Sequence, residues 1–337
     1  MKPMSSRERF LTALKRQQPD RVPWFESYVH RGLADRIVGR KTDLPPGWRT
    51  PPDLYKILCL DTITYNFRPP FYAIMEKNGD VEQLKEGLLK TRDDLRALKE
   101  FLPDPEDPDF YSGAKELLAF ARENGLAAIA GIRVGLSNTY NSMGYENFSY
   151  ALYDDPGFIE ESMELIGEWC IKVIERVNDL GFDAAYISED IAFKWGPMFS
   201  PEHFRKYMLP HMKKVVDHIA IPRIYHTDGN PLPMLKDLVD ELNICAIANL
   251  EHGAVDIFQV KDEWGDKICL IGNMDLHYTL TMGTPEETVL EAKEKLERVG
   301  KGGGYVISSS NGLTEYCKPE NILALNGAIL RYGVYYN

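Results

Sequence analysis

The sequence predicts a (β/α)8 barrel that spans residues 1–337 as a single domain. Eight short apolar runs follow one another along the chain, and helical segments connect most of them. The runs are continuously apolar rather than alternating, which is typical of parallel strands that helices cover on both sides. Barrels often reach this length as one domain. An open doubly wound sheet with a small second domain is the alternative, although no linker separates two parts of the chain.

The N-terminal part is the least regular. A short amphipathic helix begins at Ser5 and ends before Pro19, and a Lys-Asn-Gly-Asp turn signal at 77–80 predicts a hairpin excursion within residues 71–90. The predicted strands are 22–25, 57–65, 126–132, 182–187, 221–225, 244–250, 268–272 and 304–309. The remaining predicted helices are 109–124, 144–152, 156–180, 200–220, 233–241, 254–263, 284–299 and 319–331.

Composition narrows the class of partner. With 51 acidic and 39 basic residues, the formal net charge of −12 argues against nucleic acid or an anionic membrane surface as a partner. It also weighs against a polyanionic substrate, unless a local basic pocket overrides it. The five cysteines are scattered and form no C-x-x-C pair, which fits free thiols in a reducing cytosol. No apolar run approaches the ~20 residues of a membrane span, and we expect a cytoplasmic protein.

The ends of the predicted strands carry the chemistry, because barrel enzymes build their sites where strands end. The polar residues at these ends are Glu26, Asp61, Arg133, Glu189, Asp190, His226, Asp228, Glu251, His252, Asn273, Asp275 and Asn311. Such an acidic set either binds a cation or contains carboxyls with raised pKa for acid catalysis.

His226 and Asp228 are the most informative pair. They lie two apart at a strand end and therefore point the same way, so that they can bind a metal or share proton transfer. The structural alternative is that Asp228 caps the next helix and His226 bonds a backbone carbonyl.

The other candidates have structural alternatives too. Asp61 interrupts an apolar run, which favours a functional carboxylate over a turn cap. Glu189 and Asp190 are adjacent and can point in different directions, one capping a helix and one catalytic. Arg133 can pair with Glu189 or Glu26, or it can bind substrate.

Several motifs, in this order and at this spacing, resemble the uroporphyrinogen decarboxylase family, including its corrinoid-dependent methyltransferase branch. They are RVP at 21–23, Asp61, GPMFSPEHF at 196–204, YHTDGN at 225–230, GNMD at 272–275 and PENI at 319–322. The resemblance implies a (β/α)8 barrel, and it places Asp61 at the position of the family's central aspartate.

Two departures from the family pattern shape the expected function. The arginine-rich stretch that clamps porphyrinogen carboxylates is replaced here by WFESYVH at 24–30, and Glu26 would repel such a substrate. The methyltransferase branch binds zinc through His-x-Cys and a later Cys. Here His226 matches the histidine, Asp228 replaces the first cysteine, and Ser310 or Asn311 falls where the second would be. Nitrogen and oxygen ligands remain available for a harder zinc site.

The resemblance therefore implies a methyltransferase that moves a methyl group from a small O- or N-methylated compound to a separate corrinoid protein, with zinc as Lewis acid. We expect His226 and Asp228 as metal ligands. The expected catalytic residues are Asp61, Glu189, Asp190 and His226. The expected substrate-binding residues are Glu26, Tyr65, Arg133, Tyr186, Asn273 and Asn311.

Two other functions remain open. One is acid-base chemistry such as decarboxylation of a smaller carboxylate, with Asp61 and His226 as metal-free proton donors. The other is a ligand-binding barrel without catalysis. A homodimer is also open, because barrels often pair through their helices.

Overall fold

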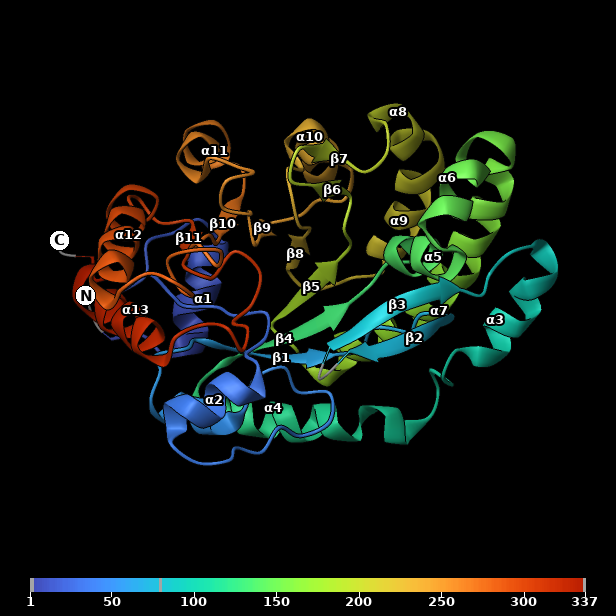
Figure 1. The fold of residues 1–337 in the computed structure, drawn as a ribbon. Helices are drawn as coiled ribbons and strands as arrows, with labels where there is room; N and C mark the ends of the chain where they lie inside the picture. The colour runs from blue at the N-terminus through green and yellow to red at the C-terminus, as the bar shows by residue number, and fades with distance from the viewer. Residues whose placement is uncertain (1–2, 79–80, 336–337) are drawn as a thin grey trace.

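The computed structural model describes residues 3–78 and 81–335, and a curled parallel sheet with helices around it forms its centre (Figure 1). Seven strands pair in the order β1-β4-β5-β8-β9-β10-β11, every pairing parallel. These strands are β1 (Thr62–Asn66), β4 (Ala127–Ile132), β5 (Ala184–Ser188), β8 (Arg223–His226), β9 (Ala246–Ala248), β10 (Cys269–Ile271) and β11 (Tyr305–Val306).

Residues 23–25 close this sheet into a barrel. Trp24 forms a parallel bridge with Ile307, whose N–H donates to the carbonyl of Pro23 at 3.0 Å. On the other side, the N–H of Asp61, just before β1, donates to the carbonyl of Trp24 at 2.9 Å. The segment therefore lies between β11 and β1 as the eighth strand, and the predicted (β/α)8 barrel is confirmed.

The helices connect successive strands and surround the sheet, as Figure 1 shows. They are α1 (Ser6–Leu14), α2 (Arg31–Val38), α3 (Leu95–Phe101), α4 (Ser112–Asn124), α5 (Leu136–Met143), α6 (Tyr145–Asp154), α7 (Pro156–Leu180), α8 (Pro201–His203), α9 (Leu209–Val216), α10 (Leu232–Glu241), α11 (Ile257–Trp264), α12 (Pro285–Arg298) and α13 (Pro319–Tyr332). Short 3-10 segments cover Pro52–Lys56, Arg92–Asp94 and Pro108–Tyr111.

Two predicted elements, the helix 200–220 and the strand 57–65, differ from the structure, and helices α2, α3 and α5 were not predicted. The predicted helix 200–220 is interrupted by a π-helical turn at Phe204–Met208, after which Pro210 lies in the first turn of α9. Proline has no N–H for the regular helical ladder, which explains a change of register there. Helix α5 was not predicted, although Leu136, Tyr140 and Met143 repeat at helical spacing, because polar residues make up the rest of its eight residues. The predicted strand 57–65 begins only at Thr62, because a 3-10 turn precedes it.

The predicted hairpin excursion is present outside the barrel. Strands β2 (Ala73–Asn78) and β3 (Val81–Gly87) pair antiparallel, and residues 79–80 of the predicted turn lie outside the described residues. A second small hairpin pairs β6 (Ala192–Phe193) with β7 (Gly196–Pro197) above β8.

The barrel has an apolar interior that is closed at the N-terminal ends of the strands. Its buried residues include Ile129, Ile224 and Ile271 from the strands, together with Phe10 and Leu14 of α1. Helix α1 therefore fills the lower end, and the strands' C-terminal ends remain for polar side chains. Among residues 3–78 and 81–335, no helix is long and apolar enough to cross a membrane.

Candidate functional site

Polar side chains that face the barrel interior lie at its mouth, where the strands reach their C-terminal ends. Alternate residues of a strand face the same side. On β8, Ile224 lies in the barrel core, and the next positions of its row are His226 and Asp228. On β5, Tyr186 lies in the core and its row leads to Asp190. Strands β5 and β8 are neighbours, so these side chains meet.

Asp190, His226 and Asp228 form a cluster, called here the acidic cluster, of the kind that can hold a metal ion. The Nε2 atom of His226 lies 3.8 Å from Oδ1 of Asp190 and 3.8 Å from Oδ1 of Asp228. One donor atom from each residue lies within 4.8 Å of the other two. Catalytic zinc sites commonly use three nitrogen and oxygen ligands and keep one position open, and this donor set fits that pattern.

Asp228 is held in place from two sides. Nδ2 of Asn311 donates to both of its carboxylate oxygens, at 3.0 and 3.1 Å. Its backbone N–H donates to Oδ1 of Asp190 at 3.1 Å. The carbonyl of Asn311 in turn accepts from Oγ of Ser27 at 2.6 Å, and it also accepts from Asn249. Burial raises the pKa of Asp228, and the nearby charges of Asp190 and Glu251 add to this shift.

His226 is buried and is kept neutral by its surroundings. Burial lowers the pKa of its imidazole, and the positive charges of Arg68 and Arg133 lower it further, against the opposite effect of Asp190. Its ring stacks on that of Tyr186 with 5.3 Å between centroids and 19° between planes. A neutral imidazole is the form that binds metals, so the environment suits a ligand role.

Glu189 and Asp190 point in different directions. The Glu189 carboxylate is fully buried and accepts from the backbone N–H of Val134 and of Ser137, in the first turn of α5. Burial raises the pKa of Glu189, while Arg133 and these N–H groups oppose the shift. Glu189 thus anchors α5 behind the mouth, and only Asp190 joins the cluster.

Glu26 is enclosed by hydrogen bonds at the closing seam of the barrel. It accepts from Nε1 of Trp24 at 2.8 Å, and from the N–H and Oγ of Ser309 at 3.0 and 2.6 Å. Burial raises its pKa to about 7. The structure shows Glu26 as a link between the first and last strands, next to the mouth.

The predicted position of Asp61 at a strand end is wrong. Asp61 precedes β1, whose first residue is Thr62, and therefore lies at the N-terminal end of the barrel. Its carboxylate is fully buried and ion-paired with Arg9 and Arg21 at 2.6 and 2.9 Å. The apolar run before it forms a turn rather than the strand, so the sequence pattern placed Asp61 at the opposite end of the strand.

Tyr65 is also far from the cluster. Because it alternates with the inward-facing positions of β1, its ring belongs to the outer core between sheet and helices, with a centroid 4.7 Å from that of Phe67. Its predicted contact with substrate does not fit this placement.

Arg133 lies at the mouth beside two arginines that the sequence reasoning missed, Arg49 and Arg68. Arg68 lies two residues beyond the end of β1, and the sequence pattern does not single it out because it predicts Asp61 as the polar residue of that strand. Arg49 comes from a loop that pairs along β1 through an N–H bond to Thr64 at 3.0 Å. No periodic pattern marks such a loop residue.

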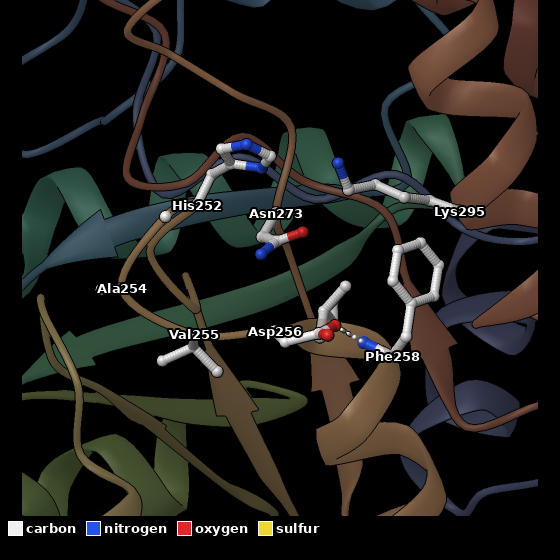
Figure 2. A pocket seen from close by; sticks show the side chains of 9 residues that line it. His252, Ala254, Val255, Asp256, Phe258, Asn273 and Lys295 are labelled. Carbon is white, nitrogen blue, oxygen red and sulfur yellow. Dashed lines mark hydrogen bonds between the residues drawn. The ribbon is translucent and has the colours of Figure 1, made fainter.

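Asn273 lines a separate pocket of about 430 Å³ between the loop at His252 and helix α12. Figure 2 shows Asn273 between His252, Asp256 and Lys295. Lys295 is buried and paired with Glu291. The lining of this pocket includes no member of the acidic cluster, whereas Asn311 contacts Asp228 directly.

Comparison with known proteins finds relatives over nearly the whole chain. The uroporphyrinogen decarboxylases of Chlorobaculum tepidum and Chlorobaculum parvum are 24% and 25% identical, each alignment covering 96% of this chain and 97% of the relative. The solved structure of a methyltransferase from Methanosarcina mazei is 18% identical with a TM-score of 0.76, over 98% of this chain and 99% of that one. At that identity, the structural likeness shows the fold.

A sequence model of the uroporphyrinogen decarboxylase family matches residues 83–332, most of the chain. The match covers the segments that provide Arg133, Asp190, His226 and Asn311. The chain belongs to the uroporphyrinogen decarboxylase family, as its sequence motifs predicted.

Proposed function

We propose that this protein is a methyltransferase that moves a methyl group from a small O- or N-methylated compound to a corrinoid protein. The observation that carries the proposal is the acidic cluster, in which one neutral imidazole and two carboxylates converge at the mouth of the barrel. This is a donor set for a divalent ion rather than for a proton relay alone.

When bound, zinc supplies a Lewis acid that polarises the oxygen or nitrogen bearing the methyl group, while the reduced corrinoid of the partner supplies the nucleophile. His226, Asp190 and Asp228 would hold the ion. In the transfer the methyl–heteroatom bond would break with its electron pair left on the heteroatom, which would take up a proton, and the methyl carbon would form a new bond with the electron pair of the partner's reduced corrinoid.

The neighbouring side chains position these ligands. Asn311 fixes both oxygens of Asp228, and Tyr186 stacks on the ring of His226. Such supporting contacts set the orientation of metal ligands and their affinity. Asp228 and Asp190 are partly exposed, with 43% and 40% of their side-chain surface accessible, so a substrate can reach the same atoms.

The comparisons support an enzyme of this family but leave its reaction open. The curated relatives are decarboxylases, at 24–25% identity, and the similar solved structure is that of a methyltransferase. A barrel of this shape is thus found with both kinds of chemistry.

The direct test follows methyl transfer. The zinc-loaded protein is mixed with a reduced corrinoid protein and with a panel of O- and N-methylated compounds, and the absorbance of methylcobalt is recorded. We expect signal with at least one donor, and its loss in His226→Ala. Absence of methylcobalt with every donor, from protein shown to contain zinc, would overturn the proposal.

Decarboxylation of a small carboxylate is the second candidate, and the named relatives favour it. The metal-free form that pairs Asp61 with His226 as proton donors fails, because the two residues lie at opposite ends of the barrel. In this structure, Asp190 and His226 would have to supply the proton. CO2 release that survives removal of metal by a chelator would favour this candidate over methyl transfer.

A further inference from the structure

Three arginines stand beside the acidic cluster at the mouth of the barrel. They are Arg49, Arg68 and Arg133, called here the arginine cluster. In the strand order β1-β4-β5-β8, they lie at the β1 and β4 positions of the rim, next to Tyr186 of β5 and His226 of β8. Nothing in the proposed chemistry at the metal ligands uses them. Their number is unexpected in a chain with a net charge of −12.

The strand register places Arg68 and Arg133 side by side. Asn66 of β1 pairs with Gly131 of β4, and each arginine lies two residues beyond its member of this pair. Asn138 then ties the two loops together. Its Oδ1 accepts from Nη1 of Arg133 at 3.3 Å, and its Nδ2 donates to the carbonyls of the two prolines after Arg68, at 3.0 Å each.

Arg49 comes to the same rim from the other side of β1. Trp48, which forms an antiparallel bridge to Tyr65, is buried in the outer core. The next residue in such a pairing faces the opposite way, which directs Arg49 toward the mouth. Its guanidinium lies over the ring of Tyr28 at 5.1 Å from the centroid.

No carboxylate of the described residues lies within ion-pair distance of the arginine cluster, although the charges of Asp190 and Glu189 act on Arg68 and Arg133. In the described part of the chain, none of the three forms an ion pair, and each has a buried Nε without a hydrogen-bond partner. Most of the polar contacts that do exist are weak: the Arg133–Asn138 bond at 3.3 Å, and guanidinium–ring contacts of Arg49 and of Arg133, the latter 4.4 Å from the centroid of Phe71.

Positive charge that is partly removed from water without an ion-pair partner is costly. Burial lowers the pKa of Arg68 to about 9, the charges of Arg133 and Arg49 contribute to that shift, and the charge of Asp190 opposes it. Burial also lowers the pKa of Arg49. An unpaired desolvated charge destabilises a protein unless another group neutralises it. A ligand with negative charge is the group that is missing.

We propose that the arginine cluster binds the carboxylate of the methyl donor, so that the substrates are small methylated carboxylic acids. The inference rests on the proposed function for the methyl group, whereas binding of the carboxylate stands on the arginines alone. The planar guanidinium edge pairs with a carboxylate through two parallel hydrogen bonds.

Charge and shape favour a monocarboxylate over a phosphate or a polycarboxylate. Asp190 and Asp228 lie on the adjoining part of the rim, and they repel any further negative charge on the ligand. The rings of Tyr28 and Phe71 contact Arg49 and Arg133, and Tyr186 stacks on His226 of the acidic cluster, which suits a flat or apolar body between the carboxylate and the methyl group.

Binding is tested without corrinoid by thermal unfolding of the zinc-loaded protein in matched ligands. We use 4-methoxybenzoate against 4-methoxybenzyl alcohol, and trimethylglycine against choline, with inorganic phosphate as the second anion. We expect saturable stabilisation by at least one carboxylate and none by its neutral or cationic partner. Stabilisation by phosphate alone, or by no anion at all, would overturn the proposal.

The variants Arg68→Gln and Arg133→Gln then test whether the carboxylate binds at the arginine cluster. We expect each to weaken carboxylate binding about 10- to 100-fold, while the free protein unfolds at the same temperature as the wild type or higher. A purely structural arginine would instead lower the unfolding temperature. The matched control is Arg96→Gln on the surface of α3, where the side chain is 87% exposed, and it should change neither property. Unchanged carboxylate affinity in both folded variants would contradict the inference.

The outcomes separate this inference from the proposed function. Carboxylate binding that depends on Arg68, in a protein that never forms methylcobalt, would retain the anion site and remove methyl transfer. Methyl transfer that is as fast from neutral donors as from their carboxylated partners would retain the reaction and remove the anion site.

Discussion

Both ends of the barrel gather charged side chains, but only the lower end joins them in short ion pairs. At the lower end, the Asp61 carboxylate accepts from Arg9 at 2.6 Å, from Arg21 at 2.9 Å and from the N–H of Trp24 at 2.8 Å. At the mouth, no carboxylate among the described residues forms an ion pair with the arginine cluster, and Nε2 of His226 lies 3.8 Å from the carboxylates of Asp190 and Asp228.

This difference distinguishes charged side chains that stabilise the fold from charged side chains that bind a ligand. A buried charge with a full set of partners holds elements of the fold together, here α1, the closing strand and β1. Removal of one partner should then destabilise the protein. Charges that the protein leaves without partners are explained by what they bind, and their removal should cost function rather than stability.

The largest expected effect is at the lower end. Asp61→Asn would leave Arg9 and Arg21 without their buried partner, and we expect a loss of about 3–5 kcal/mol in the free energy of unfolding. Denaturant titration measures it. Glu100→Gln on the surface, where the side chain is 67% exposed, is the control and should leave that free energy nearly unchanged. A folded Asp61→Asn protein of wild-type stability that lacks activity would contradict the structural role.

At the mouth, the matching change is His226→Ala. We expect metal affinity and methyl transfer to fall by at least about 100-fold, since even supporting residues of metal sites contribute 10- to 100-fold. The free energy of unfolding of the metal-free protein should not fall as in Asp61→Asn. His218→Ala, on the surface, is the control for histidine loss. Equal metal affinity in His226→Ala and His218→Ala would exclude the acidic cluster as the metal site.

Asn311 is a supporting residue at the mouth, because it donates hydrogen bonds to the proposed metal ligand Asp228 and is not itself proposed as a ligand. Asn311→Ala should leave the Asp228 carboxylate free to rotate, and we expect metal affinity to fall about tenfold. Competition with a chromophoric chelator measures that affinity. Asn124→Ala at the end of α4 serves as the control. A loss well beyond about 100-fold, as expected for His226→Ala, would instead indicate that Asn311 is a ligand itself.

The smallest effect concerns Glu26, which belongs to the seam between the two ends. An unfolded glutamate has a pKa of about 4.3, whereas burial raises that of Glu26 to about 7. The folded state therefore binds more protons between these values, and Glu26 should lower the free energy of unfolding as pH rises from about 4.3 to 7.

Glu26→Gln keeps an acceptor for Trp24 and removes the titration. The variant should lack this part of the pH dependence and match or exceed wild-type stability at pH 8. Denaturant unfolding at several pH values measures both slopes. If both proteins showed the same slope between pH 5 and 7, Glu26 would not be the group that titrates.

Much of the fold could be predicted from the sequence. Continuous apolar runs predicted the strands. Pro156 in the first turn of α7 and Gly181 just after its last residue predicted the two ends of this helix. These are local signals. The interruption of the predicted helix 200–220 and the presence of α5 were missed, because Glu189 supports the first turn of α5 from a distant part of the chain.

Site residues could be predicted only where they directly follow an apolar run that forms a strand. His226, Asp228 and Asp190 follow apolar runs directly, and the structure brings them together. Asp61 was placed wrongly because an apolar turn before it resembles a strand. The arginine cluster was not predicted as a unit, because its members come from three segments that only the barrel register aligns.

The most direct test of the central claim, that unpartnered charges at the mouth bind ligands, is the metal content of the protein. Elemental analysis would compare the wild type with the double variant His226→Ala, Asp228→Ala after both are supplied with zinc. The account predicts close to one zinc per chain in the wild type and none in the folded variant. A wild type without metal, or a variant that retains it, would contradict the account.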